Sequence, residues 1–273
     1  MIKNSKNTVK LTRLDGLNNL NYLLSYDDKS YFLKCNFKDK NKNFSYEYKL
    51  LTLLDLNHIC PKVIYKDTCS YTIISEFISN SRIDESTCTD PKFLLSLSNK
   101  LKNMHNLKCD YIYNPFNEIR KKLSILKKLN FKFSNEFIFI IRKLDAIETI
   151  LCNDINYGLC HNDLNPSNIL YKNDEVFLID FEFSGMWDIF YDIATFCWLL
   201  DDNSRKIFLM SYFNNFSQEL HLKFKRYLFV VKLWNICWSY VKSFSSTSDY
   251  DYKKGGDLVL IDLYNDLKDD KYL

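Results

Sequence analysis

Short strand-like stretches fill much of the first 80 positions of the chain, and in the first of them, Thr8–Leu14, apolar and polar residues alternate. A period of two residues is typical of a β-strand with one buried face. The predicted strands are Thr8–Leu14, Leu20–Tyr26, Ser30–Phe37, Lys62–Tyr65 and Ser70–Ile78. Residues 41–57 carry apolar side chains at positions 44, 50, 51 and 54, which indicates a helix. The pattern therefore predicts a small α+β lobe in which strands surround one helix.

Helical periodicity prevails from about Asp84 onward. The predicted helices are Pro91–Leu107, Pro115–Leu129, Asn135–Leu151, Trp187–Leu200, Arg205–Phe213, Gln218–Phe244 and a short one near 257–268. The segment 157–182 holds the only clear strands of this part. Because Ser79-Asn80-Ser81 is a short polar break, we expect an N-terminal lobe of residues 1–80 and a mainly helical C-terminal lobe of residues 81–273.

The composition is that of an ordinary globular protein. A net charge of +3 over 273 residues, with basic and acidic residues interspersed, gives no reason to expect a nucleic-acid partner. Nine scattered cysteines, no C-x-x-C pair, and no leader or membrane-spanning stretch predict a soluble cytoplasmic protein with reduced thiols. The chain has only five glycines, and we expect each of them to mark a turn. The sequence does not define the oligomeric state.

The segment from His161 to Glu182 carries the most specific chemistry. It reads H-N-D-L-N-P-S-N and then, after an apolar stretch, F-L-I-D-F-E. Asp163 can accept a proton from an attacking hydroxyl, while the oxygens of Asn168 and Asp180 can hold the Mg²⁺ that bridges nucleotide phosphates. The order and spacing match the catalytic half of the kinase signature set. His161 is expected to hold the loop rather than to take part in the reaction.

Lys34 and Glu47 complete the pattern that phosphoryl transfer from a nucleotide requires. Lys34 lies on the third predicted strand and can reach phosphates, and Glu47 in the following helix can pair with it. Gly16–Asn19, between the first two strands, occupies the phosphate-covering position without being a G-x-G-x-x-G motif. Asn18 and Asn19 can contact phosphate there, or the segment can be an ordinary hairpin turn.

The motifs together resemble the choline/ethanolamine kinase and aminoglycoside phosphotransferase superfamily, over nearly the whole chain. The opening G-L-N-N-L-N-Y at Gly16 and the segment I-D-F-E-F-S-G at Ile179 are most similar to bacterial choline kinases of the LicA type. The resemblance implies a bilobal α+β fold like that of protein kinases, with ATP as co-substrate and Mg²⁺ as cofactor. It implies that Asp163 is the base, that Asn168 and Asp180 bind Mg²⁺, and that Glu76–Ile78 forms the adenine-binding hinge.

The resemblance also suggests an acceptor site and leaves its occupant open. The residues expected to contact the acceptor are Asn165, Glu182, Trp187, Tyr191, Trp234 and Trp238. Trp234 and Trp238 are four residues apart on one helix and can form an aromatic cage for the quaternary ammonium of choline, or simply pack in the core. The sequence also departs from the family pattern: Phe183 replaces a tyrosine, and no proline follows Asp188.

Choline or ethanolamine is the predicted acceptor. Two alternatives stay open: a phosphotransferase of the same superfamily that acts on an aminoglycoside, thiamine or a sugar, and a catalytically weak kinase-like binding protein. Glu219 is the only acid from Asn203 to Ser248, whereas an aminoglycoside site should be rich in acids. Thiamine or a sugar fits the same superfamily. A kinase-like protein that binds nucleotide without turnover is a different class, which the intact Asp163, Asn168, Asp180 and Lys34 disfavour.

Overall fold

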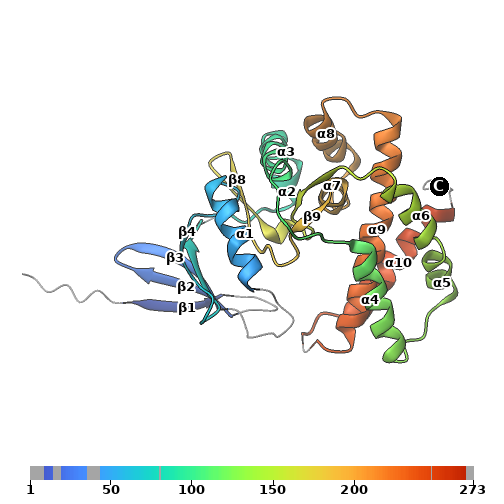
Figure 1. Cartoon of the computed structure of the whole chain (residues 1–273), viewed down its shortest axis with the longest axis horizontal. Helices are drawn as coiled ribbons and strands as arrows, with labels where there is room; N and C mark the ends of the chain where they lie inside the picture. Colours follow the sequence, from blue (N-terminus) through green and yellow to red (C-terminus); the bar gives the residue numbers. More distant parts are fainter. Residues whose placement is uncertain (1–8, 15–19, 36–43, 80, 247, 269–273) are drawn as a thin grey trace, which may run out of the picture. The chain divides into compact units, whose positions relative to one another are not determined.

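The computed structural model describes residues 9–14, 20–35, 44–79, 81–246 and 248–268, so Asn80, in the middle of the polar break at 79–81, lies outside them. The chain divides into two compact units (Figure 1). The first combines Met1–Met104 with Asn165–Glu182, and the second combines His105–Leu164 with Phe183–Leu273. Each unit is therefore built from two separate stretches of sequence. The predicted lobe boundary near residue 80 stays a prediction.

An antiparallel five-stranded sheet forms much of the first unit, in the order β1-β2-β3-β5-β4. Its strands are β1 (Lys10–Leu14), β2 (Leu20–Tyr26), β3 (Lys29–Cys35), β4 (Val63–Asp67) and β5 (Thr72–Glu76). The helix α1 (Phe44–Leu56) lies between β3 and β4 in the sequence. Over the described residues these elements confirm the predicted small α+β arrangement.

Three further elements complete the first unit. They are α2 (Glu85–Thr89), most of α3 (Pro91–His105), and the hairpin formed by β7 (Ile169–Lys172) and β8 (Glu175–Leu178). The hairpin is joined to the earlier stretch by backbone hydrogen bonds. Leu178 donates its N–H to the Ile59 carbonyl at 2.9 Å, and Tyr171 donates to the Ser81 carbonyl at 2.7 Å.

Asparagine and aspartate, rather than glycine, occupy most of the left-handed backbone positions. Among the described residues, the non-glycine positions with positive φ are Asp27, Asp28, His58, Tyr71, Asn130, Asn162, Asn173, Asp174, Asp180 and Asn214. Asn and Asp tolerate this region better than other side chains because they form local hydrogen bonds. The pair Asp27-Asp28, for example, has φ values of 50° and 61°, as in the two-residue turns that suit hairpins.

The described glycines serve close packing instead. None of them has a positive φ, so the expectation that each glycine marks a turn is wrong for Gly158, Gly185, Gly255 and Gly256. A Cβ on Gly158 would come within 2.7 Å of the His105 carbonyl oxygen. These positions therefore require a small residue because a neighbouring segment passes close to the backbone.

The second unit is mainly helical and is centred on one long helix. Its elements are α4 (Pro115–Lys128), α5 (Asn135–Ile141), α6 (Leu144–Cys152), β6 (Tyr157–Cys160), β9 (Gly185–Asp188), α7 (Phe190–Cys197), α8 (Asp202–Phe213), α9 (Gln218–Ser243) and α10 (Tyr252–Lys268). Helix α9 packs against α4, α7 and α10 (Figure 1). Its middle is buried on nearly every side, which explains the dense apolar sequence from Tyr227 to Leu233.

Two predicted helices in this unit differ from the structure. The helix expected over 135–151 is split into α5 and α6, because Lys143 donates its N–H to the carbonyl of Ile140, three residues back. The helix expected from Trp187 begins only at Phe190, and residues 185–188 instead form β9, which pairs with β6. A four-residue strand buried at every position has no alternating pattern, so its sequence resembles a helix start.

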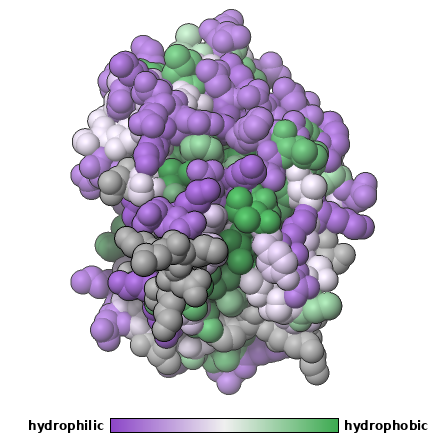
Figure 2. Space-filling view, turned by 90° about the vertical axis from the view of Figure 1, so that its left-hand side faces the viewer, coloured by the Kyte–Doolittle hydropathy of each residue, from purple (hydrophilic) through white to green (hydrophobic). Residues whose placement is uncertain are grey.

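The surface of the described part shows no membrane-spanning element. Among the described residues no helix combines the length and the apolar character needed to cross a bilayer, since charged side chains interrupt even α9. The face drawn in Figure 2 is largely hydrophilic, with smaller groups of hydrophobic residues between.

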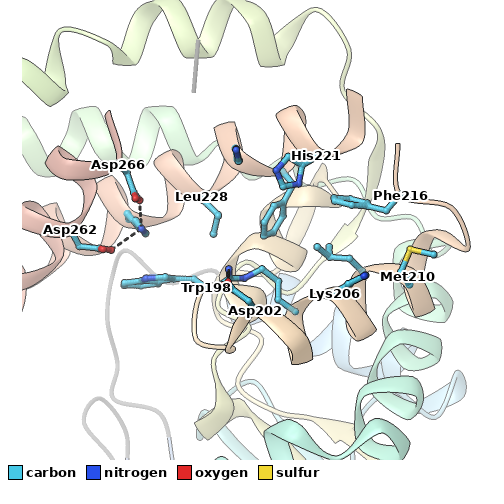
Figure 3. Close-up of a pocket in the computed structure, with 14 residues that line it drawn as sticks. Trp198, Asp202, Lys206, Met210, Phe216, His221, Leu228, Asp262 and Asp266 are labelled. Carbon is cyan, nitrogen blue, oxygen red and sulfur yellow. Dashed lines mark hydrogen bonds and ion pairs between the residues drawn. The ribbon is translucent and has the colours of Figure 1, made fainter. Parts of the chain in front are cut away.

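A cavity of about 640 Å³ lies among α8, α9 and α10 (Figure 3). Lys232 lies in its wall between two carboxylates, with its Nζ 2.7 Å from Asp262 and 2.6 Å from Asp266. Its lining includes Trp198, Arg205, Leu209, Phe216, Phe224 and Leu228, and none of the predicted site residues. The buried cation thus ties α9 to α10 rather than marking the predicted site.

Candidate active site

The β7–β8 hairpin of the first unit brings Asn168 and Asp180 together. Asn168 ends the short 3-10 turn Pro166–Asn168 directly before β7, and Asp180 comes two residues after β8 ends at Leu178. The N–H of Ile179 donates to the carbonyl of Asn168 at 3.0 Å, which holds the two ends of the hairpin side by side. Asp180 has a φ of 65°, so the chain turns sharply at this residue.

Lys34 lies between two carboxylates in the same unit. Its Nζ is 3.3 Å from Glu47 Oε1 and 2.9 Å from Asp180 Oδ1. Burial alone would lower the pKa of Lys34, but the charges of Asp180 and Glu47 outweigh it and raise the pKa above that of a free lysine. Lys34 is therefore a permanent cation at the end of the hairpin, and the expected Lys34–Glu47 ion pair is present.

The donor set of the first unit suits a magnesium ion. Mg²⁺ prefers oxygen ligands and usually takes one or two carboxylates together with waters and phosphates. Asn168 supplies an amide oxygen and Asp180 a carboxylate, and the Lys34 ammonium at 2.9 Å shows that this carboxylate already attracts positive charge. The residues therefore fit the predicted metal, although their role as ligands stays a prediction.

Two of the predicted nucleotide contacts, Glu76 and Ile78, lie at the end of β5. Glu76 is the last residue of β5, and Ile78 follows it, with its carbonyl accepting the Ser81 hydroxyl at 2.5 Å. Asn18 and Asn19 lie outside the described residues. The nucleotide-binding role of all four stays a prediction.

Asp163 belongs to the second unit, on a loop that a buried aspartate holds. The loop follows β6, and Asp192 on α7 accepts the backbone N–H groups of His161 and Asn162, both at 2.7 Å. His105 adds a third contact, with its Nε2 3.1 Å from Asp192. Asp192 has no exposed surface. The sequence analysis missed this residue because nothing local distinguishes it from other acids.

His161 and Asn162 complete the fixed geometry of this loop. The His161 ring accepts the Asp163 N–H at its Nδ1, over 3.3 Å, and its carbonyl accepts the Ser184 hydroxyl at 3.2 Å. Asn162, in the left-handed region, donates its side-chain amide to the Phe183 carbonyl at 3.0 Å. His161 therefore orients the backbone, as expected, and Asp163 remains half-buried at the end of the loop.

Removing the Asp192 carboxylate should destabilise the loop and the fold. Asp192→Ala leaves two buried backbone donors without their acceptor, and each unsatisfied group costs about 1–3 kcal/mol. We expect the free energy of unfolding, measured by urea denaturation, to fall by at least about 3 kcal/mol. Asp192→Asn keeps one oxygen acceptor and should lose less. A loss below about 1 kcal/mol in the alanine variant would show that other groups hold the loop.

A continuous group of aromatic rings lies in the second unit, and we call it the aromatic cluster: Tyr113, Phe183, Tyr191, Trp234 and Trp238. The ring centroids of Tyr191 and Tyr113 are 6.0 Å apart, and those of Tyr113 and Phe183 are 6.5 Å apart. The centroids of Phe183 and Trp234 are 6.0 Å apart, and those of Trp234 and Trp238 are 6.4 Å apart. Burial raises the pKa values of the Tyr113 and Tyr191 phenols, and the Asp163 carboxylate is among the charges that raise them further. Asp163 thus lies beside this cluster.

The expected acceptor residues differ in how well their positions suit a ligand. Phe183, Trp234 and Trp238 are half-buried. Trp187 and Tyr191 are each only 2% exposed, which suits core packing rather than contact with an acceptor. The predicted contact of Trp187 and Tyr191 with the acceptor stays a prediction, and their low exposure does not support it. Tyr113 and Phe183 were not among the expected contacts, and a single aromatic residue in the sequence gives no sign of such a role.

The polar members of the expected set have structural partners. Asp188, which is not itself among the expected contacts, is fully buried and accepts backbone N–H groups from Asn156 and Phe190, each at 3.0 Å. Asn165 caps the turn before β7 by accepting the Ser167 N–H at 3.0 Å. Glu182 belongs to the first unit, where its charge contributes to raising the pKa of Lys34 after those of Asp180 and Glu47. Contact of Asn165 or Glu182 with an acceptor stays a prediction.

The sequence is similar to those of known phosphotransferases. Residues 10–223 match the model of the phosphotransferase enzyme family. The chain is 27% identical over 211 residues to a LicA homolog protein of Metamycoplasma hominis, covering 76% of this chain and 78% of the relative. It is 30% identical over 129 residues to protein LicA of Haemophilus influenzae, covering 44% of this chain and 35% of the relative.

A solved structure extends the likeness to the fold. The choline kinase LicA from Streptococcus pneumoniae superposes with a TM-score of 0.79 over 94% of this chain and 93% of that chain, at 22% identity. This similarity confirms the predicted kinase-like α+β fold. Since the family model spans most of the sequence, the chain belongs to the phosphotransferase enzyme family.

Proposed function

We propose that this phosphotransferase uses ATP and Mg²⁺ to phosphorylate the hydroxyl of a small amine alcohol, with choline as the preferred acceptor. The contact of the buried Lys34 with Asp180, on the same hairpin as Asn168, carries the nucleotide part of the proposal. A fixed cation beside hard oxygen donors is what a nucleotide triphosphate with its metal requires.

The residues divide the reaction between them. The Asp163 carboxylate orients the acceptor hydroxyl and takes its proton as the new O–P bond forms, and ADP leaves. Asn168 and Asp180 would hold Mg²⁺, which offsets the negative charge of the phosphates when bound. Lys34 stays protonated because its pKa is raised, so it can neutralise a phosphate oxygen at any physiological pH.

The aromatic cluster favours a cationic acceptor. A quaternary ammonium has no N–H to donate, so proteins bind it with aromatic faces. The indoles of Trp234 and Trp238 are nearly parallel, with an interplanar angle of 11°, and both are half-buried. The name of the Streptococcus pneumoniae protein, a choline kinase, supports the same acceptor. Ethanolamine, thiamine, a sugar and an aminoglycoside are the alternatives within the family, and the cytoplasmic location stays a prediction.

A coupled assay with Mg²⁺ and ATP tests the proposal directly. We expect ADP release with choline, slower release with ethanolamine, and little with thiamine, sugars or kanamycin. Omitting Mg²⁺ should abolish the signal. ADP release with none of these acceptors, in a protein shown to bind ATP, would instead favour a nucleotide-binding protein without turnover.

Trimming the indoles should weaken the binding of choline without affecting ATP. A cation over an indole contributes about 2 kcal/mol when the site is dry, which corresponds to roughly thirtyfold in affinity. Leucine keeps an apolar filler and removes the π face. We therefore expect the choline KM to rise about tenfold, with the ATP KM nearly unchanged, in at least one of Trp234→Leu and Trp238→Leu. Ethanolamine, which keeps N–H donors, should suffer less.

Trp198→Leu is the matched control, because Trp198 lines the separate cavity among α8, α9 and α10. It should leave both KM values unchanged. If Trp234 and Trp238 serve only core packing, their variants will melt at lower temperature with an unchanged choline KM in the folded fraction. That result in both variants would remove the support for a cage.

A further inference from the structure

A lysine already occupies the face of one cage tryptophan. Lys122 lies on α4, and its Nζ is 4.4 Å from the centroid of the Trp234 ring. This is the position and distance at which an ammonium ion binds an indole. The side chain of Lys122 is only 14% exposed. The aromatic cluster therefore holds a cation of its own.

The surroundings hold Lys122 in place only weakly. Its ion pair with Glu118, one turn earlier, is long, at 3.8 Å, and Glu118 is also bound by Lys121 at 2.7 Å. Burial lowers the pKa of Lys122 below that of a free lysine, and Glu118 offsets this only in part. The protonated side chain is thus partly desolvated, and the nearest carboxylate partner that the described residues offer is 3.8 Å away, so it can exchange this place for water.

We propose that Lys122 is a built-in competitor that an ammonium acceptor must displace from the face of Trp234, so that this lysine sets how tightly the acceptor binds. The inference rests on the proposed function, because it takes the acceptor to be a cation. Two positive charges cannot share one face of one indole, since they repel each other at contact distance in a partly dry site. The affinity for a cation is therefore lower than the aromatic cluster alone would give.

A charge-removing substitution should strengthen cation binding. Lys122→Met keeps an unbranched apolar side chain of similar length and removes the ammonium. We expect tetramethylammonium and choline, titrated by calorimetry in the absence of nucleotide, to bind about tenfold more tightly to Lys122→Met than to the unmodified protein. Melting curves confirm that each protein is folded at the titration temperature.

Lys121→Met is the matched control. Lys121 is the neighbouring residue, pairs with the same Glu118, and has a side chain that is 69% exposed. Its removal changes the net charge equally but leaves the face of Trp234 covered, so the affinity should stay within twofold. If Lys122→Met binds the cations no more tightly than the unmodified protein, or gains no more than Lys121→Met, the proposal is wrong.

The pH dependence supplies a second readout. The titratable groups that act on Lys122 are Glu118 and Lys121 on α4 and the buried thiol of Cys237 on α9. Because tetramethylammonium keeps its charge at every pH, its affinity should rise as pH increases through the lowered pKa of Lys122 and the lysine becomes neutral. Lys121→Met should show the same rise, and Lys122→Met should not. A rise of equal size in Lys122→Met would contradict the proposal.

These measurements separate the inference from the proposed function. One outcome is that choline is not phosphorylated but tetramethylammonium binds Lys122→Met about tenfold more tightly. In that case the proposed substrate is wrong, and the proposal that Lys122 competes for the face of Trp234 is supported. If choline is phosphorylated but Lys122→Met shows no gain in cation binding, the proposed function stands and the role of Lys122 fails.

Discussion

Asp163→Asn should lower the turnover of acceptor phosphorylation at least about a hundredfold, the lower end of the contribution of a general base. The amide has the same shape as the carboxylate but cannot accept the proton of the hydroxyl. The loop should keep its position, because Asp192 holds it through the backbone N–H groups of His161 and Asn162 rather than through Asp163. The melting temperature should therefore change little.

The comparison needs a second Asp→Asn variant. Asp249 is exposed, so Asp249→Asn changes the charge of the protein equally without touching the loop. It should keep full turnover and an unchanged melting curve. If Asp163→Asn turned over within threefold of the unmodified protein, another group would have to be the base.

Asp180→Ala should abolish turnover at every Mg²⁺ concentration that supports the unmodified protein. Two interactions are lost together, since Asp180 is both the candidate carboxylate ligand of the metal and the partner of Lys34 at 2.9 Å. The alanine also has to adopt the left-handed backbone of this position, which costs roughly 1–2 kcal/mol. A titration of activity against Mg²⁺ measures the first effect, and a melting curve measures the second.

Asp180→Asn separates these effects, because asparagine tolerates a positive φ and keeps one oxygen donor. It should fold as well as the unmodified protein but require far more Mg²⁺. Turnover of Asp180→Ala equal to that of the unmodified protein at the same Mg²⁺ concentration would exclude Asp180 as a ligand.

The sequence was sufficient where local pattern and local structure coincide. Local strand patterns and the turn at Asp27-Asp28 predicted the strands of the sheet, and the spacing from Asn168 to Asp180 corresponds to one short hairpin that places both residues at its open end. The Lys34–Glu47 ion pair could be predicted from the sequence because the two residues lie on consecutive elements, β3 and α1. In these cases the information needed was contained within a few tens of residues.

The remaining features depend on contacts between distant segments. Strand β9 pairs with β6, and its Trp187, which was expected to contact the acceptor, is buried. Asp192 acts on a loop thirty residues earlier, and Lys122 meets Trp234 from another helix. No local pattern distinguishes such residues from other acids and lysines, so only the folded chain reveals them.

The discontinuous first unit has a consequence for the order in which the chain can fold. Lys34 meets Asp180, and Ile59 accepts the N–H of Leu178, across more than a hundred residues of sequence. A ribosome adds about 5–20 residues per second, so the first 104 residues wait several seconds for the segment 165–182 that completes their unit. Until then the nascent sheet lacks its hairpin and the cation at position 34 lacks one of its two carboxylates. Assembly of this half of the protein is therefore coupled to synthesis of the middle of the chain, and contacts of such long range are slow to form.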